Sequence, residues 1–185
     1  MKLTMRPFIL VGIKNTQRRR DLTGSTTNAE DRKIAPRVGG SAAFRQFIRE
    51  KLMPQVKQRY RTTAETAIVG ESLAGLFVVE TLLLEPKLFS TYLAFDPSLW
   101  WNNGQLAAKA GSLLRAAARP VVTVYLATSN QDDLKATQQV VDAAVSAARP
   151  WHYEPMPEET HATIYHPAAL RAFRAVFKPQ TKGKP

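Results

Sequence analysis

Residues 66–75 read Thr-Ala-Ile-Val-Gly-Glu-Ser-Leu-Ala-Gly, and this stretch decides the fold class. Its first five residues have the pattern of a short buried strand. The apolar residues that follow, as far as Leu84, predict a helix that Pro86 closes. Small residues on both sides of Ser72 allow a sharp turn between the two elements. We therefore expect a strand, a tight turn and a helix in immediate succession, with Ser72 at the turn.

The same alternation continues towards the carboxyl terminus. Further strands are predicted at Thr91–Phe95, Val121–Ala127 and Trp151–Met156, and further helices in the segment that ends before Pro120, at Leu134–Ala148 and at Pro167–Phe177. Apolar strands that alternate with helices favour an α/β domain with a mainly parallel sheet and helices on both faces.

The amino-terminal third is organised differently. Pro7–Ile13 is apolar throughout and predicts a strand buried on both faces, which makes about five strands in all. Residues 14–40 have the composition of a long polar loop. Ser41 is a plausible N-cap for a helix that reaches Tyr60 with one apolar stripe, in which Pro54 predicts a kink.

Size and composition exclude several classes of protein. With 185 residues, the chain predicts one domain over residues 1–178 and a polar tail over residues 179–185. It has no cysteine, so disulfides and thiolate metal sites are excluded. No apolar run approaches the roughly 20 residues of a membrane helix, and the amino terminus lacks a signal-peptide pattern. The expectation for the chain as written is a cytoplasmic protein without membrane association, and the alternative is an exported, longer parent protein.

The formal net charge of +11 lies entirely in the first third of the chain. Residues 1–61 hold 15 Lys and Arg against 4 Asp and Glu, and the remaining residues balance to zero. Arg18, Arg19 and Arg20 form the tightest basic cluster, without interleaved aromatic residues. Nucleic-acid binding is therefore a weaker interpretation than a solvated loop, and an anion-binding role for the cluster stays open.

The turn at Ser72 carries the pattern of a nucleophile elbow. Such a turn forces the serine into strained backbone geometry and lifts its hydroxyl above the carboxyl edge of the sheet. The backbone N–H of Leu73, at the start of the helix, would then face a developing oxyanion. Taken by itself, the short motif favours a serine that merely caps the helix over a nucleophile.

A histidine and two aspartates follow Ser72 in the chain order that α/β-hydrolases use. His161 lies in a polar loop after the last strand and is the candidate general base, whereas His152 and His166 are interpreted as structural. Asp132 or Asp133, after the strand Val121–Ala127, would orient the imidazole, although either could instead cap the next helix.

Three stretches together resemble the putative-esterase family of α/β-hydrolases, which includes enterochelin and ferric-siderophore esterases. They are Gly-Glu-Ser-Leu-Ala-Gly at 70–75, Phe-Asp-Pro-Ser-Leu-Trp-Trp at 95–101, and Glu-Thr-His-Ala-Thr at 159–163 with His-Pro beyond it. The resemblance implies a serine esterase in which Ser72 is the nucleophile, His161 the base and Leu73 an oxyanion donor. It implies a small-molecule ester as substrate and needs no metal or organic cofactor.

The resemblance also suggests which residues meet the substrate. Trp100 and Trp101 would lie near the serine and line a pocket, with core or surface packing as the alternative. Arg20, with its two arginine neighbours, would lie at the active-site edge, where an anionic ester could reach it. Glu71 is a substrate-binding candidate at a position where the family commonly has His or Gln. Ala74 stands where the family has Gly.

The resemblance starts only at the strand that Pro7–Ile13 would form, so the sheet is expected to be truncated at its amino-terminal side. The expected loss includes a strand that supplies the second oxyanion donor, and loss of one donor typically costs about 100- to 1000-fold in turnover. The alternative to an active esterase is therefore a weak or inactive homologue that self-associates or binds partners through exposed strand edges.

Overall fold

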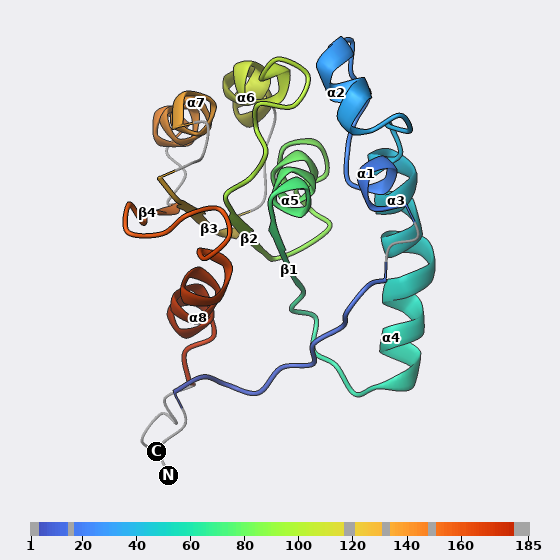
Figure 1. Ribbon diagram of the computed structural model, residues 1–185. Helices are drawn as coiled ribbons and strands as arrows, with labels where there is room; N and C mark the ends of the chain where they lie inside the picture. Colours follow the sequence, from blue (N-terminus) through green and yellow to red (C-terminus); the bar gives the residue numbers. More distant parts are fainter. Residues whose placement is uncertain (1–3, 15–16, 117–120, 131–133, 148–150, 180–185) are drawn as a thin grey trace.

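Four parallel strands form the sheet on which the protein is built. The computed structural model describes residues 4–14, 17–116, 121–130, 134–147 and 151–179 (Figure 1). The strands are β1 (Ala67–Glu71), β2 (Thr91–Phe95), β3 (Thr123–Thr128) and β4 (His152–Pro155). Their spatial order, β1-β2-β3-β4, is also their order along the chain, and every pairing is parallel. The predicted α/β class with a parallel sheet is confirmed.

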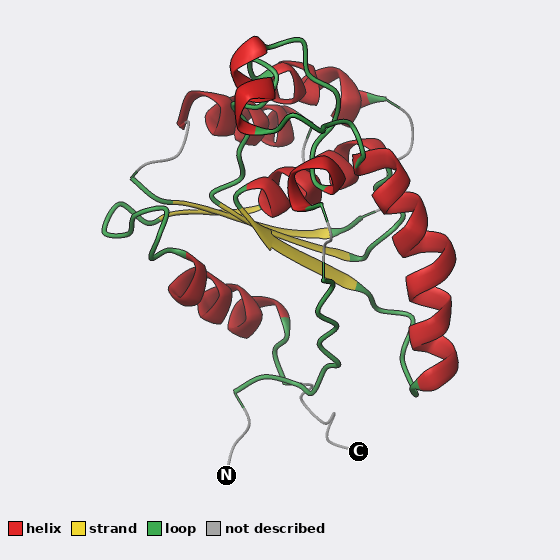
Figure 2. Ribbon diagram, turned by 45° about the vertical axis from the view of Figure 1, so that its right-hand side comes forward, coloured by secondary structure: helices red, strands yellow, loops and turns green. Residues whose placement is uncertain are grey.

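Helices cover both faces of the sheet, as expected (Figure 2). One face carries α5 (Leu73–Leu84), α6 (Gln105–Arg115) and α7 (Leu134–Ser146), and the other face carries α8 (Tyr165–Val176). Successive side chains of a strand point to opposite faces of the sheet, so each strand contributes to both cores. Tyr92 and Leu126 belong to the core under α5. Leu93 and Tyr125 belong to the core against α8. None of the described helices is long and apolar enough to cross a membrane.

The predicted long helix after Gly40 consists of three consecutive pieces. They are α3 (Ser41–Phe47), the π-helical turn η1 (Ile48–Leu52) and α4 (Met53–Arg59). The N-cap is Gly40, so the helix begins one residue earlier than the predicted N-cap at Ser41 requires. Pro54 has no N–H to donate, and its ring would collide with the carbonyl four residues earlier. The wider π-turn directly before Pro54 is the local adjustment that accommodates it.

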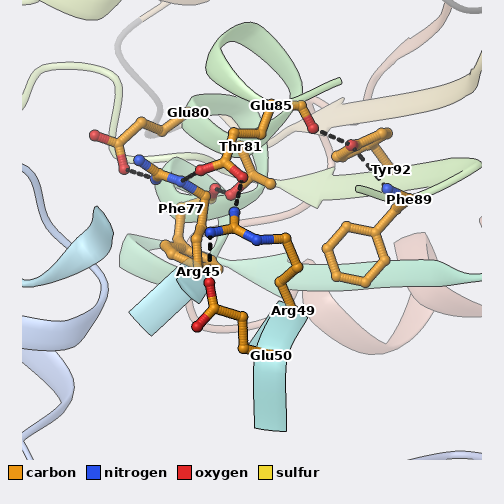
Figure 3. A network of polar contacts seen from close by, with 9 residues as sticks. All are labelled: Arg45, Arg49, Glu50, Phe77, Glu80, Thr81, Glu85, Phe89 and Tyr92. Atoms are coloured by element: carbon orange, nitrogen blue, oxygen red, sulfur yellow. Dashed lines mark hydrogen bonds and ion pairs between the residues drawn. The ribbon is translucent and has the colours of Figure 1, made fainter. Parts of the chain in front are cut away.

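An ionic cluster joins this helix to α5 (Figure 3). The buried guanidinium of Arg45 donates to Glu80 at 2.6 Å and to Glu85 at 3.2 Å. It also lies over the ring of Phe77, 5.7 Å from the ring centroid. Because α5 starts directly after Ser72, this cluster anchors the helix that supports the predicted turn.

The predicted strand at Pro7–Ile13 is wrong. The segment is extended but pairs with no described strand, and most of its apolar side chains are exposed, Leu10 to 73%. Its contacts are with the end of α8, where the Arg6 N–H donates to the Phe177 carbonyl at 2.9 Å and the Phe8 ring packs on Phe173. A strand needs a neighbour for its backbone groups, and among the described residues none lies beside this segment. The sheet therefore has four described strands, not about five.

The polar stretch that follows contains two short helices, where a loop was predicted. They are α1 (Arg18–Asp21) and α2 (Ala29–Ile34). The carboxylate of the buried Asp31, in α2, accepts the Asn102 N–H at 2.8 Å and the Thr26 hydroxyl at 2.5 Å. These bonds dock α2 onto the loop that follows β2, at the carboxyl edge of the sheet.

Candidate active site

Ser72 occupies the turn between β1 and α5 with a backbone that serine rarely adopts. Its φ is 61° and its ψ is −125°, outside the helical and extended regions. A Cβ at Gly70 would lie 2.5 Å from the backbone of Ala74, and one at Gly75 would lie 3.0 Å from the Phe95 carbonyl oxygen. The close approach of the chain on both sides of Ser72 explains why these positions are glycine.

Backbone hydrogen bonds tie the turn to the loop that follows β2. The Ser72 N–H donates to the Phe95 carbonyl at 3.1 Å, and the Ser98 N–H donates to the Ser72 carbonyl at the same distance. Residues near 72 and 96 are therefore held together at the carboxyl edge of the sheet, where parallel strands bring loop residues close.

His161 also reaches this edge, and its partner there is Asp96. The His161 Nδ1 lies 3.0 Å from the Asp96 Oδ2, whereas the imidazole is 46% exposed. The other ring nitrogen, Nε2, lies 3.8 Å from a carboxylate oxygen of Glu71, the residue directly before Ser72. One nitrogen is thus bound by a carboxylate, and the other faces the region of the serine turn.

Asp96 directly follows β2 and is almost completely buried, at 1% exposure. Its φ of 41° is in the left-handed region, where an aspartate is uncommon. Its carboxylate accepts the Ser129 N–H at 2.5 Å and the Ser129 hydroxyl at 2.5 Å. Burying a carboxylate costs free energy unless hydrogen-bond donors replace the water that it loses. The two donors of Ser129 offset this cost at Asp96.

The acid predicted from the sequence, Asp132, and its alternative, Asp133, lie outside the described residues. Asp96 belongs to the motif at 95–101 and is not among the acids predicted from the sequence. The signal that could have identified it is its position directly after a buried strand, which is the same argument that selected Asp132.

The other predicted site residues divide into buried and exposed groups. Leu73 is the first residue of α5, where backbone N–H groups have no acceptor within the helix. Trp101 is buried, and its indole N–H donates to the Gly24 carbonyl at 3.1 Å, so this ring holds the amino-terminal segment. Trp100 is exposed at the surface beside it, with 6.0 Å between ring centroids.

The arginine cluster lies on the short helix α1. The Arg20 guanidinium is paired with the carboxylate of its neighbour Asp21, 2.6 Å away, and Arg19 donates to the carbonyl of Ile34. His152, on β4, stacks on Tyr125 with 4.4 Å between centroids, and His166 lies at the start of α8. Among the described residues, no group of three or more His, Asp and Glu side chains could hold a metal ion.

The sequence matches the family model described as "Putative esterase" over residues 1–167. Among curated proteins, the Ferri-bacillibactin esterase BesA of Bacillus subtilis (strain 168) is 36% identical over 109 residues, 52% of this chain and 38% of the relative. The Siderophore enterobactin esterase of Emericella nidulans is 34% identical over 101 residues, 50% of this chain and 33% of the relative. The matched segments thus span about a third of these relatives' own length.

Solved structures share the fold over most of this chain. An IroE-like serine hydrolase from Shewanella oneidensis superposes with a TM-score of 0.75 at 24% identity, covering 88% of this chain and 57% of that one. The BES protein from Bacillus cereus superposes with a TM-score of 0.73 at 22% identity, covering 93% of this chain and 69% of that one.

Proposed function

Because the chain belongs to the "Putative esterase" family, we propose that it is a serine hydrolase that cleaves carboxylic esters by acyl transfer. The observation that carries the proposal is the buried Asp96 carboxylate, 3.0 Å from the His161 imidazole, at the sheet edge that also bears the strained Ser72. In this proposal Ser72 is the nucleophile, His161 the general base and Asp96 the acid.

The first half of the reaction forms an acyl-enzyme. The Ser72 Oγ attacks the ester carbonyl carbon, its proton passes to the His161 Nε2, and the electron pair of the C=O π bond moves to the carbonyl oxygen. When this tetrahedral intermediate collapses, the bond to the leaving oxygen breaks, and that oxygen takes the proton from Nε2. The alcohol departs, and the acyl group stays on Ser72.

The second half repeats these steps with water. Water gives a proton to Nε2 and attacks the acyl carbon; the bond to the Ser72 Oγ then breaks, and the Oγ recovers the proton. The carboxylic acid leaves, and the enzyme is regenerated. Asp96 stays ionised throughout, accepts from the Nδ1–H and stabilises the imidazolium.

We assign the first oxyanion donor to the backbone N–H of Leu73. It is the first residue of α5, so its N–H has no acceptor within the helix and lies where the helix dipole favours negative charge. A donor in such a position stabilises the developing charge on the carbonyl oxygen.

For the substrate, we propose an ester-linked siderophore. The two curated relatives described above are named as esterases of ferri-bacillibactin and of enterobactin, and both exceed 30% identity over their matched segments. The exposed Trp100 and the basic helix α1 are the candidates for contact with an aromatic, anionic substrate of this kind.

A fluorophosphonate probe tests the nucleophile directly. We expect the purified chain to be labelled at Ser72, with loss of labelling in Ser72→Ala and strong reduction in His161→Ala. The matched control is Ser112→Ala, which removes an exposed serine hydroxyl on α6 and should label like the parent chain. Circular dichroism establishes that each variant is folded. An adduct on another residue, or equal labelling of Ser72→Ala, would exclude the proposed nucleophile.

A further inference from the structure

Ser129 is the first residue after β3 and is joined to Asp96 by two hydrogen bonds. Its backbone N–H donates to Oδ1 and its hydroxyl donates to Oδ2, both at 2.5 Å. Ser129 is 3% exposed and Asp96 is 1% exposed, so solvent competes little with either bond. The two donors fix the carboxylate plane as a single donor could not.

The hydroxyl of Ser129 shares Oδ2 with the imidazole of His161. Nδ1 lies 3.0 Å from this same oxygen. A carboxylate oxygen has two lone-pair directions, and here one serves the hydroxyl and the other serves the imidazole. Rotation of the carboxylate would break the Ser129 bonds, so these bonds hold Oδ2 in the direction of His161.

The neighbours of Ser129 hold the loop that carries His161. The Thr128 carbonyl accepts the Met156 N–H at 2.7 Å, and the Asn130 N–H donates to the Glu159 carbonyl at 3.1 Å. Three consecutive residues, 128–130, thus contact both the acid and the loop of the base. Both are positioned by one short segment at the end of β3.

We propose that Ser129 is a positioning residue of the active site: its hydroxyl orients Asp96, and through Asp96 the imidazole of His161. The inference rests on the hydrolase function proposed above and adds a residue that the sequence motifs do not contain. The sequence predicted the acid in the loop after β3. In the structure this loop instead provides Ser129, whose two donors hold Asp96 from the loop after β2.

The test is a double-mutant cycle on an aryl ester. We expect Ser129→Ala to lower kcat about 10- to 100-fold, the usual effect of losing one hydrogen bond to a charged group, with KM changed less than about twofold, since no substrate contact is removed. Ser129→Thr, which keeps the hydroxyl, should restore most of kcat. In an Asp96→Asn background, Ser129→Ala should have little further effect, because the acid is already lost.

Several outcomes would overturn the inference. An unchanged kcat in Ser129→Ala would do so. An equal loss of kcat on adding Ser129→Ala to the parent and to Asp96→Asn would also do so, because it would indicate a general structural effect. If Ser129→Ala does not fold, Ser129→Cys replaces it, because the thiol fills nearly the same space and is a weak donor. A kcat equal to that of the parent would then contradict the proposal.

The proposed function and this inference fail in different ways. If the parent chain is inactive, or Ser72→Ala remains active, the hydrolase proposal fails. If the parent is active, Ser72→Ala is inactive and Ser129→Ala keeps full kcat, only the positioning role of Ser129 fails.

Discussion

The structure contains two buried ionic clusters, one at the carboxyl edge of the sheet and one between α3 and α5. In both, hydrogen-bonding or oppositely charged partners offset the free-energy cost of burying a charge, but the two clusters differ in their surroundings. At the edge, the carboxylate of Asp96 is held by Ser129 and His161. In the second cluster, the guanidinium of Arg45 is held by Glu80 and Glu85 (Figure 3). Each central charge is more than nine-tenths buried and has charged or polar partners.

The difference lies in what surrounds the partners. His161 is 46% exposed and keeps one ring nitrogen directed away from Asp96, so this cluster can exchange protons with a bound molecule. The partners of Arg45 are side chains of α5 and its carboxyl end, and Arg49 pairs again with Glu85. The first cluster is therefore suited to chemistry, and the second joins two helices. Substitutions in the two clusters should separate activity from stability.

The largest expected effect is that of Asp96→Asn on turnover. The amide nitrogen would donate to the His161 Nδ1, which stabilises the tautomer with a proton on Nε2, and this nitrogen could then not accept the proton of Ser72. We expect kcat to fall by about 10³- to 10⁴-fold, as the wrong tautomer causes in serine proteases. Ester hydrolysis and urea unfolding would be measured together. A modest loss of kcat would remove Asp96 from the proposed triad.

Arg45→Met should show the reverse pattern. Loss of Arg45 leaves Glu80 without its buried partner, so we expect the free energy of unfolding to fall by about 3 to 5 kcal/mol. At a temperature where the variant is folded, kcat should be unchanged. The control is Lys33→Met, which removes an exposed ion pair and should change stability by less than about 1 kcal/mol. Equal effects of the two substitutions would contradict the structural role of Arg45.

Tyr92 lies at the margin of the second cluster and gives a smaller effect. Its hydroxyl donates to the Glu85 carbonyl and accepts the Phe89 N–H, both at 3.2 Å, so Tyr92→Phe should lower the free energy of unfolding by about 1 to 2 kcal/mol.

Burial raises the pKa of Tyr92 from 10.0 to about 12, which means that the folded state favours the neutral phenol. The resulting stabilisation is fully present below pH 10 and is lost as the pH rises to about 12. Over this interval the parent should lose its stability advantage over Tyr92→Phe. An advantage that stays constant in denaturant titrations from pH 9 to 12 would contradict the raised pKa.

The smallest expected effect concerns Glu71, which faces Nε2 of His161 at 3.8 Å. Removing this charge should favour anionic substrates, so Glu71→Gln should lower KM for an anionic aryl ester about 2- to 5-fold relative to a neutral one. High salt should reduce the difference. Glu50→Gln removes the same charge from η1 and should leave the KM ratio unchanged. An identical shift in both variants would indicate a general charge effect.

Sequence patterns predicted the elements of the sheet well where strand and helix follow each other directly. The predicted strand at 91–95 coincides with β2, and the predicted helix as far as Leu84 coincides with α5. These elements are short, apolar and bounded by turn residues, so the local pattern agrees with the tertiary context.

Pro7–Ile13 shows the limit of such patterns. Its composition is that of a buried strand, and the structure shows an exposed extended segment on the end of α8. A strand needs a neighbouring strand that pairs with its backbone. An apolar composition indicates that a segment tends to be buried, but it does not indicate whether such a neighbour is present. No local pattern could indicate that this neighbour is missing among the described residues.

The sequence by itself determined the α/β class, the turn at Ser72 and its order relative to His161, because short-range periodicity and small residues at the turn encode them. Only the tertiary structure brought Asp96 and Ser129 to His161, from loops separated by more than thirty residues. Strand register and loop packing bring such loops together at the sheet edge, and those depend on contacts across the whole domain. Motifs locate candidate reactive groups along the chain, whereas the fold determines which of them lie within hydrogen-bond distance of one another.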